Sequence, residues 1–297
     1  MTDDPADGAF APRSTERLSG AWLPIRLTAL LLLFDMVPVW YLNPLMISLV
    51  GLGMVFPSLL RTPAVWEAIL LVLAMWIARL WPLVDNHIYL LGYWALAILI
   101  ALRRPDPHRA LAVSARWLVV CVFVWATLWK GVLSPDYRDG RFFTVRLMSD
   151  PRFEEHAVLL SGLTRDEVRQ NRAFLDARPR SPEEPERPAA FRSSDRYRFW
   201  VTVFTWGLLV AEAGVALVFL IPWGRMTVIL RHGVLMAFCL ATFAFAPVPA
   251  FGWLLVIMGL AQVDPSRRTL RAIYVAVWFL IALVSQAPWA ALISKLV

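Results

Sequence analysis

The sequence predicts an all-α fold, a polytopic bundle of about nine transmembrane helices with one hydrophilic insertion. Of the 297 residues, 59% are hydrophobic and 17% are charged, which makes the chain more apolar than soluble globular proteins usually are. Several stretches approach the roughly 20 consecutive apolar residues that cross the hydrocarbon core of a bilayer. Residues 134–197 form the one long hydrophilic stretch between them. Together these observations predict a membrane protein.

Nine apolar ranges are expected to form the spans. They are residues 21–41, 44–60, 63–83, 86–102, 117–133, 198–221, 227–245, 248–263 and 271–293. The second and eighth ranges are short and interrupted by Gly or Pro, so the count falls to eight if one of them is a re-entrant segment packed against protein. We expect residues 1–20 to form an N-terminal tail and residues 21–293 to form one membrane domain.

Arginine-rich short loops set the expected orientation. These loops are RRPDPHRALAVSAR (103–116), WGRMTVILR (223–231) and DPSRRTLR (264–271). The positive-inside rule places all three in the cytoplasm. With nine spans, the N-terminus is then cytoplasmic, whereas the C-terminus and the 134–197 insertion are external. The net charge of +7 fits basic loops of a multi-pass protein of the cell membrane and does not indicate nucleic-acid binding.

The 134–197 insertion is expected to contain two short helices and a linker. The first helix has Asp150 as its N-cap and ends before Gly162. The second begins with a capping box formed by Thr164 and Glu167. Residues 178–188 are rich in Pro and charge, which is typical of an extended linker. The insertion is also a candidate docking surface for a protein partner.

Lys130 is the leading candidate for chemistry. Only two of the 29 basic residues are lysines, yet one of them stands at the outer end of the fifth span beside Trp125 and Trp129. Arginine keeps its proton in proteins, whereas desolvation can convert a lysine into a base. As a base, Lys130 requires Asp136 and Asp139 to point toward solvent. The alternative is a lysine that anchors the helix by reaching lipid headgroups.

Two histidines lie within the expected spans, where polar groups are costly and therefore indicate a use. His87 opens the fourth span on the same outer side as Lys130, so we expect the two residues to line one cavity. Its neighbour Asn86 either supports it or caps the helix. His232 lies about two turns into the seventh span, with structural and functional roles both open.

Two of the acidic residues within the expected spans are also candidates. Glu212, in the middle of the sixth span, is too deep to reach water, so we expect it to be buried and paired with a basic group such as Arg79 or Arg26. A structural ion pair is the simplest explanation of Asp35 as well.

Several classes of site are missing from the sequence. There is no Cys/His cluster with zinc spacing, no phosphate-binding G-x-x-x-x-G-K-[ST] loop and no G-x-S-x-G motif. Four scattered histidines do not favour haem ligation, and we expect no metal and no nucleic-acid partner. The many Trp residues suit an interfacial belt or an aromatic-lined cavity for a flat quinone-like ring.

Three segments together resemble the horizontally transferred transmembrane (HTTM) family, which includes the vitamin K-dependent γ-carboxylases. They are DNHIYLLGYWALAILIAL (85–102), WATLWKGVLSPDYRDGRFFTVRL (125–147) and AEAGVALVFLIPWGRMTVILRHGVLMAFCLATFAF (211–245). The first carries an N-H-x-Y-L motif, and in the second a lysine precedes an acidic–aromatic–Gly stretch. The matching residues are Asn86, His87, Tyr89, Leu90, Lys130, Asp136, Tyr137, Gly140, Glu212, Arg225 and His232, with Arg26 in the first span also similar.

The resemblance implies a role for these residues. In the carboxylases the matching lysine deprotonates vitamin K hydroquinone, supported by the matching histidine. Carried over, Lys130 is the base and Asn86 and His87 tune it, so these three form the expected catalytic set. The expected cofactor is a reduced quinone resembling vitamin K hydroquinone. The residues expected to bind it are His232, Trp125, Trp129, Tyr89, Arg26 and Glu212.

Two functions follow from these expectations. The first is a quinol-dependent membrane enzyme of lyase or monooxygenase type, resembling the carboxylase core and acting through Lys130. The carboxylases add a large lumenal domain, which the 134–197 insertion is too short and too Pro-rich to replace, so we expect quinol chemistry rather than carboxylation of protein glutamates. The alternative is a non-catalytic membrane subunit that binds a lipid, a quinone or another protein.

Overall fold

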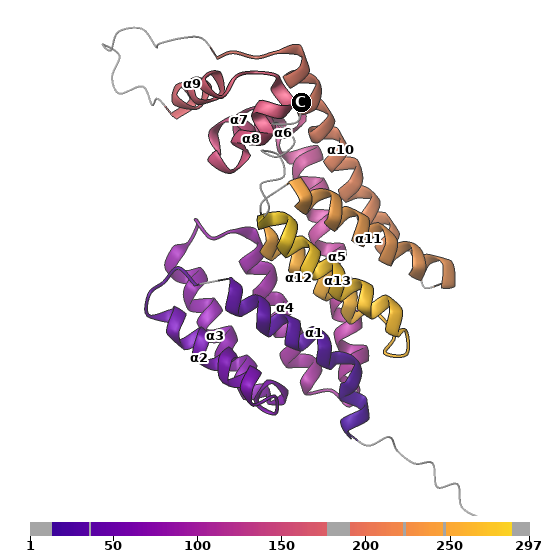
Figure 1. Ribbon diagram of the computed structural model, residues 1–297. Helices are drawn as coiled ribbons and strands as arrows, with labels where there is room; N and C mark the ends of the chain where they lie inside the picture. The colour runs from indigo at the N-terminus through magenta and orange to yellow at the C-terminus, as the bar shows by residue number, and fades with distance from the viewer. Residues whose placement is uncertain (1–13, 36, 177–190, 222–223, 246–247, 287–297) are drawn as a thin grey trace, which may run out of the picture. The chain divides into compact units, whose positions relative to one another are not determined.

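The computed structural model describes residues 14–35, 37–176, 191–221, 224–245 and 248–286 (Figure 1). These residues form thirteen α-helices, two 3-10 turns and one π-helical turn, with no strand among them. The expected linker at 178–188 lies outside the described residues. The chain divides into two compact units. Unit 1 comprises Met1–Leu118 and Ala250–Trp278, and unit 2 comprises Val119–Pro249 and Phe279–Val297.

Unit 1 is built around the first four helices. Its elements are α1 (Ser14–Phe34), α2 (Leu42–Val55), the 3-10 turn η1 (Leu59–Arg61), α3 (Pro63–Leu80), α4 (Asn86–Leu102), the start of α5 (Pro107–Leu128), α12 (Pro249–Ala261) and most of α13 (Arg268–Gln286). Consecutive helices α1, α2, α3 and α4 pack on one another. Trp66 and Trp94 are fully buried, and each indole has its N–H bonded, to the Leu60 carbonyl at 2.9 Å and to Thr28 Oγ1 at 2.8 Å.

A proline inside α1 explains one contact of unit 1. Pro24 lacks the N–H that would normally bond the carbonyl of Gly20, four residues earlier. Arg271 Nη1 donates to that carbonyl instead, at 3.3 Å. Thr28 Oγ1 in turn donates to the Pro24 carbonyl at 2.9 Å. Side chains therefore satisfy or share the backbone acceptors around the proline.

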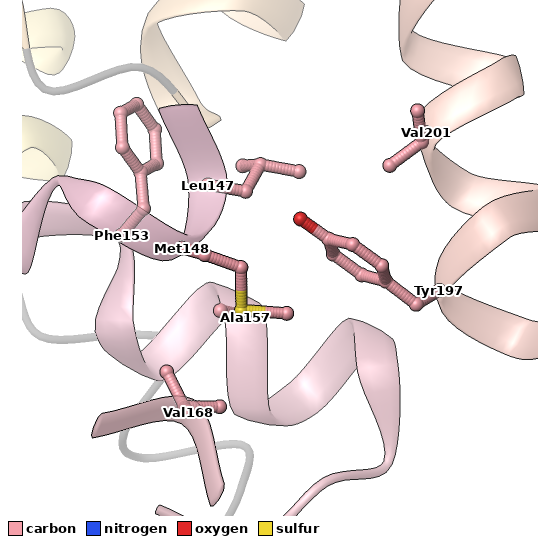
Figure 2. Packing of buried hydrophobic residues seen from close by; sticks show 7 residues of the cluster. All are labelled: Leu147, Met148, Phe153, Ala157, Val168, Tyr197 and Val201. Carbon is pink, nitrogen blue, oxygen red and sulfur yellow. The ribbon is translucent and has the colours of Figure 1, made fainter. Parts of the chain in front are cut away.

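Unit 2 holds a long helical hairpin and a group of short helices. After α5 come the π-helical turn η2 (Trp129–Leu133), α6 (Pro135–Arg138), α7 (Arg141–Ser149), the 3-10 turn η3 (Pro151–Phe153), α8 (Glu154–Ser161), α9 (Arg165–Asp176), α10 (Asp195–Leu220) and α11 (Arg225–Phe245). We call residues 135–176 the α6–α9 segment. Its core cluster joins α7, η3, α8, α9 and the start of α10 (Figure 2). The cluster consists of Leu147, Met148, Phe153, Ala157, Val168, Tyr197 and Val201.

Local signals place the two helices expected in the insertion. The Asp150 carboxylate accepts the backbone N–H of Arg152 at 3.0 Å, and α8 ends at Gly162 with φ 68°. Thr164 and Glu167 form the predicted capping box, with bonds of 2.9 Å and 3.3 Å between each backbone N–H and the other side chain. At the first expected position the chain forms the 3-10 turn η3 followed by α8, and at the second it forms α9, while α6 and α7 come in addition to them.

Each of the nine expected ranges contains a helix. Four helical stretches in the described part of the chain are long and apolar enough to cross a membrane: Pro63–Leu80, Pro107–Leu133, Asp195–Leu220 and Met226–Phe243. Shorter apolar helices cover Gly20–Phe34, Leu42–Val55, Asn86–Leu102 and Pro249–Ala261. The first expected range, 21–41, is too long, because α1 ends at Phe34. Pro38 contributes to this end, because it has no N–H to bond the Phe34 carbonyl four residues earlier.

Candidate functional site

A change in helical geometry places Lys130. The last α-helical residue of α5 is Leu128, and residues Trp129–Leu133 form a π-helical turn in which the Ser134 N–H donates to the Trp129 carbonyl at 2.8 Å. Short π-helical turns are rare and frequently occur at functional sites. Pro135 then starts α6, which leads the chain away from the axis of α5. Lys130 thus sits at the point where the long helix ends.

Lys130 is paired with Glu212. The Lys130 ammonium donates to Glu212 Oε1, and the two side chains keep 22% and 7% of their exposure. The prediction that Glu212 is buried and paired with a basic group is confirmed. The partners expected for it were wrong, because Lys130 occupies that position, whereas Arg79 is exposed in α3 and Arg26 lies over the Trp22 ring at 5.4 Å. Removing either member of such a pair leaves an uncompensated charge.

Tyr137 forms the second contact of Lys130. The ammonium lies 5.3 Å from the centre of the Tyr137 ring, within the range of a cation–π interaction. The ring is 3% exposed, and its hydroxyl has no hydrogen-bond partner among the described residues. Burial, and to a smaller extent the charge of Glu212, raises the pKa of Tyr137 above its usual value. The phenol therefore stays protonated at neutral pH and keeps an O–H to donate.

Gly140 lets the turn after α6 approach α10. Its φ of 80° is left-handed, and a Cβ there would lie 2.9 Å from Val201 Cγ1 and 3.7 Å from Thr205 Oγ1. Only glycine meets both conditions without strain. Thr205 is buried, and in the described part of the chain its hydroxyl has no partner. Because Thr205 and Glu212 are seven residues apart, they lie on the same face of α10, two turns from each other.

We call Lys130, Tyr137, Thr205 and Glu212 the Lys130 site. Three of its buried polar atoms have no hydrogen-bond partner in the described structure: Glu212 Oε2, the Tyr137 hydroxyl and Thr205 Oγ1. Sequence reasoning placed Tyr137 only within a family motif and missed Thr205. The seven-residue spacing of Thr205 and Glu212 on an otherwise apolar helix is the signal that could have found it.

The acidic residues nearest in sequence do not contact Lys130. Asp136 and Asp139 are exposed and pair with Arg141 at 2.6 Å and 2.7 Å, as expected for residues that point to solvent. The hydrogen bond from the Arg141 backbone N–H lowers the pKa of Asp139. The carboxylate that acts on Lys130 is Glu212.

His87 belongs to a different unit. In unit 1 its Nε2 lies 3.2 Å from Asp35 Oδ2, so Asp35 has this histidine as its hydrogen-bonding partner. Asn86 is exposed and is the first residue of α4, after the N-cap Asp85, so Asn86 is not the cap. Tyr89 packs edge-to-face on Trp81 at 6.1 Å. A cavity shared by His87 and Lys130 stays a prediction.

The remaining expected ligands of a quinone lie in varied surroundings. Trp125 and Trp129 are exposed and tilted toward each other, with ring centres 6.4 Å apart. His232 is buried in α11 of unit 2. In unit 1, Arg26 and Arg61 both lie over the Trp22 ring, at 5.4 Å and 4.7 Å.

No cluster of three or more His, Cys, Asp or Glu residues suited to a metal ion occurs within the described ranges. The Lys130 site consists of a cation, a carboxylate and two hydroxyl groups, which can bind polar groups and exchange protons.

Comparisons of the chain with protein-family models, with curated proteins and with solved structures find no match to any of them.

Proposed function

We propose that the chain is a multi-pass protein of the cell membrane, of HTTM type, that acts on a quinol-like substrate through Lys130. The Lys130–Glu212 pair carries the proposal, because an ion pair in the apolar helices of unit 2 is costly unless it has a use. The four long apolar helices support the membrane location. The proposed topology has a cytoplasmic N-terminus, with the C-terminus and residues 134–197 external.

The contact with Glu212 changes how Lys130 can act as a base. A neighbouring carboxylate favours the charged form of an amine. Lys130 can therefore accept a proton only in the state in which its own proton has moved to Glu212. That transfer leaves the net charge of the pair at zero, so it does not require an isolated charge to be buried. The sequence-based prediction relies on desolvation beside Trp129 to make Lys130 a base. In this proposal, transfer of the lysine proton to Glu212 has that role instead.

The residues of the site are compatible with a reduced quinone. Its hydroxyl groups match the unpaired Glu212 Oε2 and the unpaired Tyr137 hydroxyl. When bound, a reduced quinone supplies an ionisable hydroxyl and two electrons. The protein's part is to orient that hydroxyl and to hold its proton on the Lys130–Glu212 pair. His232, which lies in the same unit, is proposed to support this site, and the roles expected of His87 and Asn86 stay predictions.

Substitution of Lys130 tests the enzyme proposal. Lys130→Arg keeps the cation beside Glu212 but removes the base, so it should fold normally and consume hydroquinone at least ~100-fold more slowly. Lys130→Ala should lose activity as well and should also be less stable, because Glu212 is left unpaired. The measurements are hydroquinone consumption in membranes and thermal unfolding of the purified chain. Full activity of the Arg variant would rule out Lys130 as the base.

The second candidate function is a non-catalytic subunit that binds a lipid, a quinone or a protein, the last through residues 134–197. It is favoured by one observation, that Glu212 already neutralises Lys130 as a structural ion pair would. This function predicts that Lys130→Arg behaves as wild type in every assay. The same pair of variants therefore separates the two functions.

A further inference from the structure

Two unpaired polar atoms lie beside one ion pair in unit 2, on Glu212 itself and on Tyr137 next to Lys130, and a third, on Thr205, lies two turns along the same face of α10. Glu212, Tyr137 and Thr205 are 6%, 3% and 1% exposed, so water does not satisfy these atoms from outside. Buried polar atoms in native proteins are almost always hydrogen-bonded, and each one that is not lowers stability. Native sequences keep such local costs mainly at functional sites. The grouping therefore points to a bound molecule.

The unpaired atoms specify what that molecule must offer. Glu212 Oε2 is an acceptor and needs a donor, while the Tyr137 hydroxyl stays protonated and needs an acceptor. Lys130 uses one of its three N–H bonds on Glu212 Oε1 and has others to donate. A hydroxyl group donates and accepts at once, so it suits both sides of the site. An ether or a ketone offers only an acceptor and leaves Glu212 Oε2 unpaired.

The charges of the site limit the ligand further. Lys130 and Glu212 already balance each other, so a bound anion or cation would add an unpaired charge where burial is costly. A carboxylate would also meet the negative Glu212 without a proton to donate. The ligand that fits is therefore neutral. It reaches the site from the Lys130 side, because Lys130 is the more exposed member of the pair.

We propose that Glu212 and Tyr137 bind the hydroxyl groups of one neutral ligand, with Glu212 Oε2 accepting a hydroxyl hydrogen and the Tyr137 hydroxyl donating to a ligand oxygen. The site selects hydroxylated ligands over their ethers. This inference rests on the proposed function only for the choice of a hydroquinone as ligand. Thr205 extends the polar face of α10 two turns away and provides a further donor for a larger ligand.

Binding of a matched pair of probes tests the proposal. The probes are tetramethylhydroquinone and its dimethyl ether, which has the same ring but no O–H. Calorimetry on the purified full chain in detergent, under anaerobic conditions, gives the affinity for each. The wild type should bind the hydroquinone at least about 10-fold more tightly than the ether, the scale of a hydrogen bond to a charged group. Equal affinities for the two probes would refute the proposal.

Variants of the two residues locate the selectivity. Tyr137→Phe removes only the hydroxyl and should weaken hydroquinone binding roughly 3–10-fold, as expected for one neutral hydrogen bond. Glu212→Gln should weaken it by about 10-fold or more and reduce the preference over the ether. Tyr93→Phe, at an exposed tyrosine of α4, is the matched control and should bind as the wild type. If Glu212→Gln does not fold, Tyr137→Phe still decides, because it removes an atom that has no partner.

The outcomes separate this inference from the proposed function. Loss of turnover in Lys130→Arg together with unchanged binding in Tyr137→Phe supports the enzyme and refutes the hydroxyl site. Hydroxyl-selective binding that is lost in Tyr137→Phe, in a chain that turns over no hydroquinone, supports the site and refutes the enzyme. Binding that ignores both residues and both probes refutes the site whatever the activity.

Discussion

Two neighbouring regions of unit 2 differ in how some of their buried polar groups are satisfied. Around α7–α9 the buried Asp150 and Asn171 are paired: the Asp150 carboxylate accepts from Arg146 and Arg152 at 3.0 Å and 2.7 Å. Asn171 makes two 2.8 Å bonds with the backbone of Arg192. At the Lys130 site, a few residues before α7 in the chain, three buried polar atoms have no partner in the described structure.

We infer from this contrast that the paired groups around α7–α9 serve stability, whereas the unpaired groups of the Lys130 site serve the proposed binding. A paired buried group contributes to folding, whereas an unpaired one lowers stability until a ligand satisfies it. The α6–α9 segment therefore provides a scaffold that holds the turn after Lys130 against α10. In our proposal the Lys130 site keeps polar atoms unpaired for a ligand, at a cost in stability. Removing a paired polar group should accordingly lower the stability of the protein, whereas removing an unpaired one at the Lys130 site should leave it unchanged or raise it.

Gly140 joins the two regions, and its substitution should have the largest effect. Gly140→Ala forces a Cβ to within 2.9 Å of Val201 Cγ1 on a backbone with φ 80°. The left-handed conformation costs roughly 1–2 kcal/mol and the overpacking a similar amount, so unfolding in denaturant should show a loss of about 3 kcal/mol. Binding at the Lys130 site should weaken as well, because the turn can no longer lie against α10.

Gly162 is the matched control for this substitution. It also has a positive φ, of 68°, but the nearest side-chain atom to an added Cβ is 3.9 Å away. Gly162→Ala should therefore cost only the roughly 1–2 kcal/mol of backbone strain and leave ligand binding unchanged. Val201→Ala should reduce the cost of Gly140→Ala and not that of Gly162→Ala. Equal losses at the two glycines would show that the close approach to α10 is unimportant.

Substitutions of two buried tyrosines, one in each region, should change the stability by an intermediate amount. The Tyr197 hydroxyl donates to the Thr144 carbonyl at 2.8 Å, whereas that of Tyr137 has no partner among the described residues. In thermal unfolding without ligand, Tyr197→Phe should cost about 1 kcal/mol, the usual net value of a hydrogen bond. Tyr137→Phe should be neutral or stabilising. A comparable loss in Tyr137→Phe would mean that its hydroxyl is already satisfied.

In the α6–α9 segment, local sequence signals predict where helices begin and end. The Asp150 cap, the end of α8 at Gly162 and the Thr164–Glu167 box involve residues a few positions apart, so their geometry follows from the helix itself. The nine apolar ranges likewise predicted helices, since apolar length is a property of each segment. The expected range extends past the end of α1, because apolar residues continue to Tyr41 whereas Pro38 interrupts the helical hydrogen bonds.

The Lys130 site depends on contacts between distant residues, which local sequence signals do not predict. The burial and pairing of Glu212 could be predicted, because an isolated carboxylate in an apolar helix is too costly. Its partner could not, since Lys130 is 82 residues away in the sequence and the contact depends on how α5 packs against α10. Tyr137 reaches Lys130 only because a π-helical turn and α6 fold the chain back. No sequence period encodes that turn.

The smallest effect concerns the pH dependence of the α6–α9 segment. Hydrogen bonds from Arg152 and Arg172 lower the pKa values of Asp150 and Glu154 below their usual 3.8 and 4.5. A carboxyl whose pKa is lowered by folding stabilises the protein above its usual pKa, and this contribution disappears as the pH falls through the lowered value. Hydrogen exchange of the α8 and α9 amides should therefore accelerate as the pH falls from about 5 to about 3, after correction for the intrinsic rate.

Glu154→Gln should reproduce part of this loss at neutral pH. The Glu154 side chain is 17% exposed and pairs with Arg172 at 2.8 Å, so its removal should cost under about 1 kcal/mol, as for other ion pairs near a surface. The variant should also show a smaller change between neutral and acidic pH, because one of the titrating groups is gone. Asp195→Asn is the control, since Asp195 is 93% exposed beside Arg198 and should change neither the stability nor its pH dependence. An unchanged acid response in Glu154→Gln would assign the pH dependence to the other carboxyls with lowered pKa values, Asp150 and Glu167, and the segment would then depend on its helix-capping carboxylates more than on the Glu154–Arg172 pair.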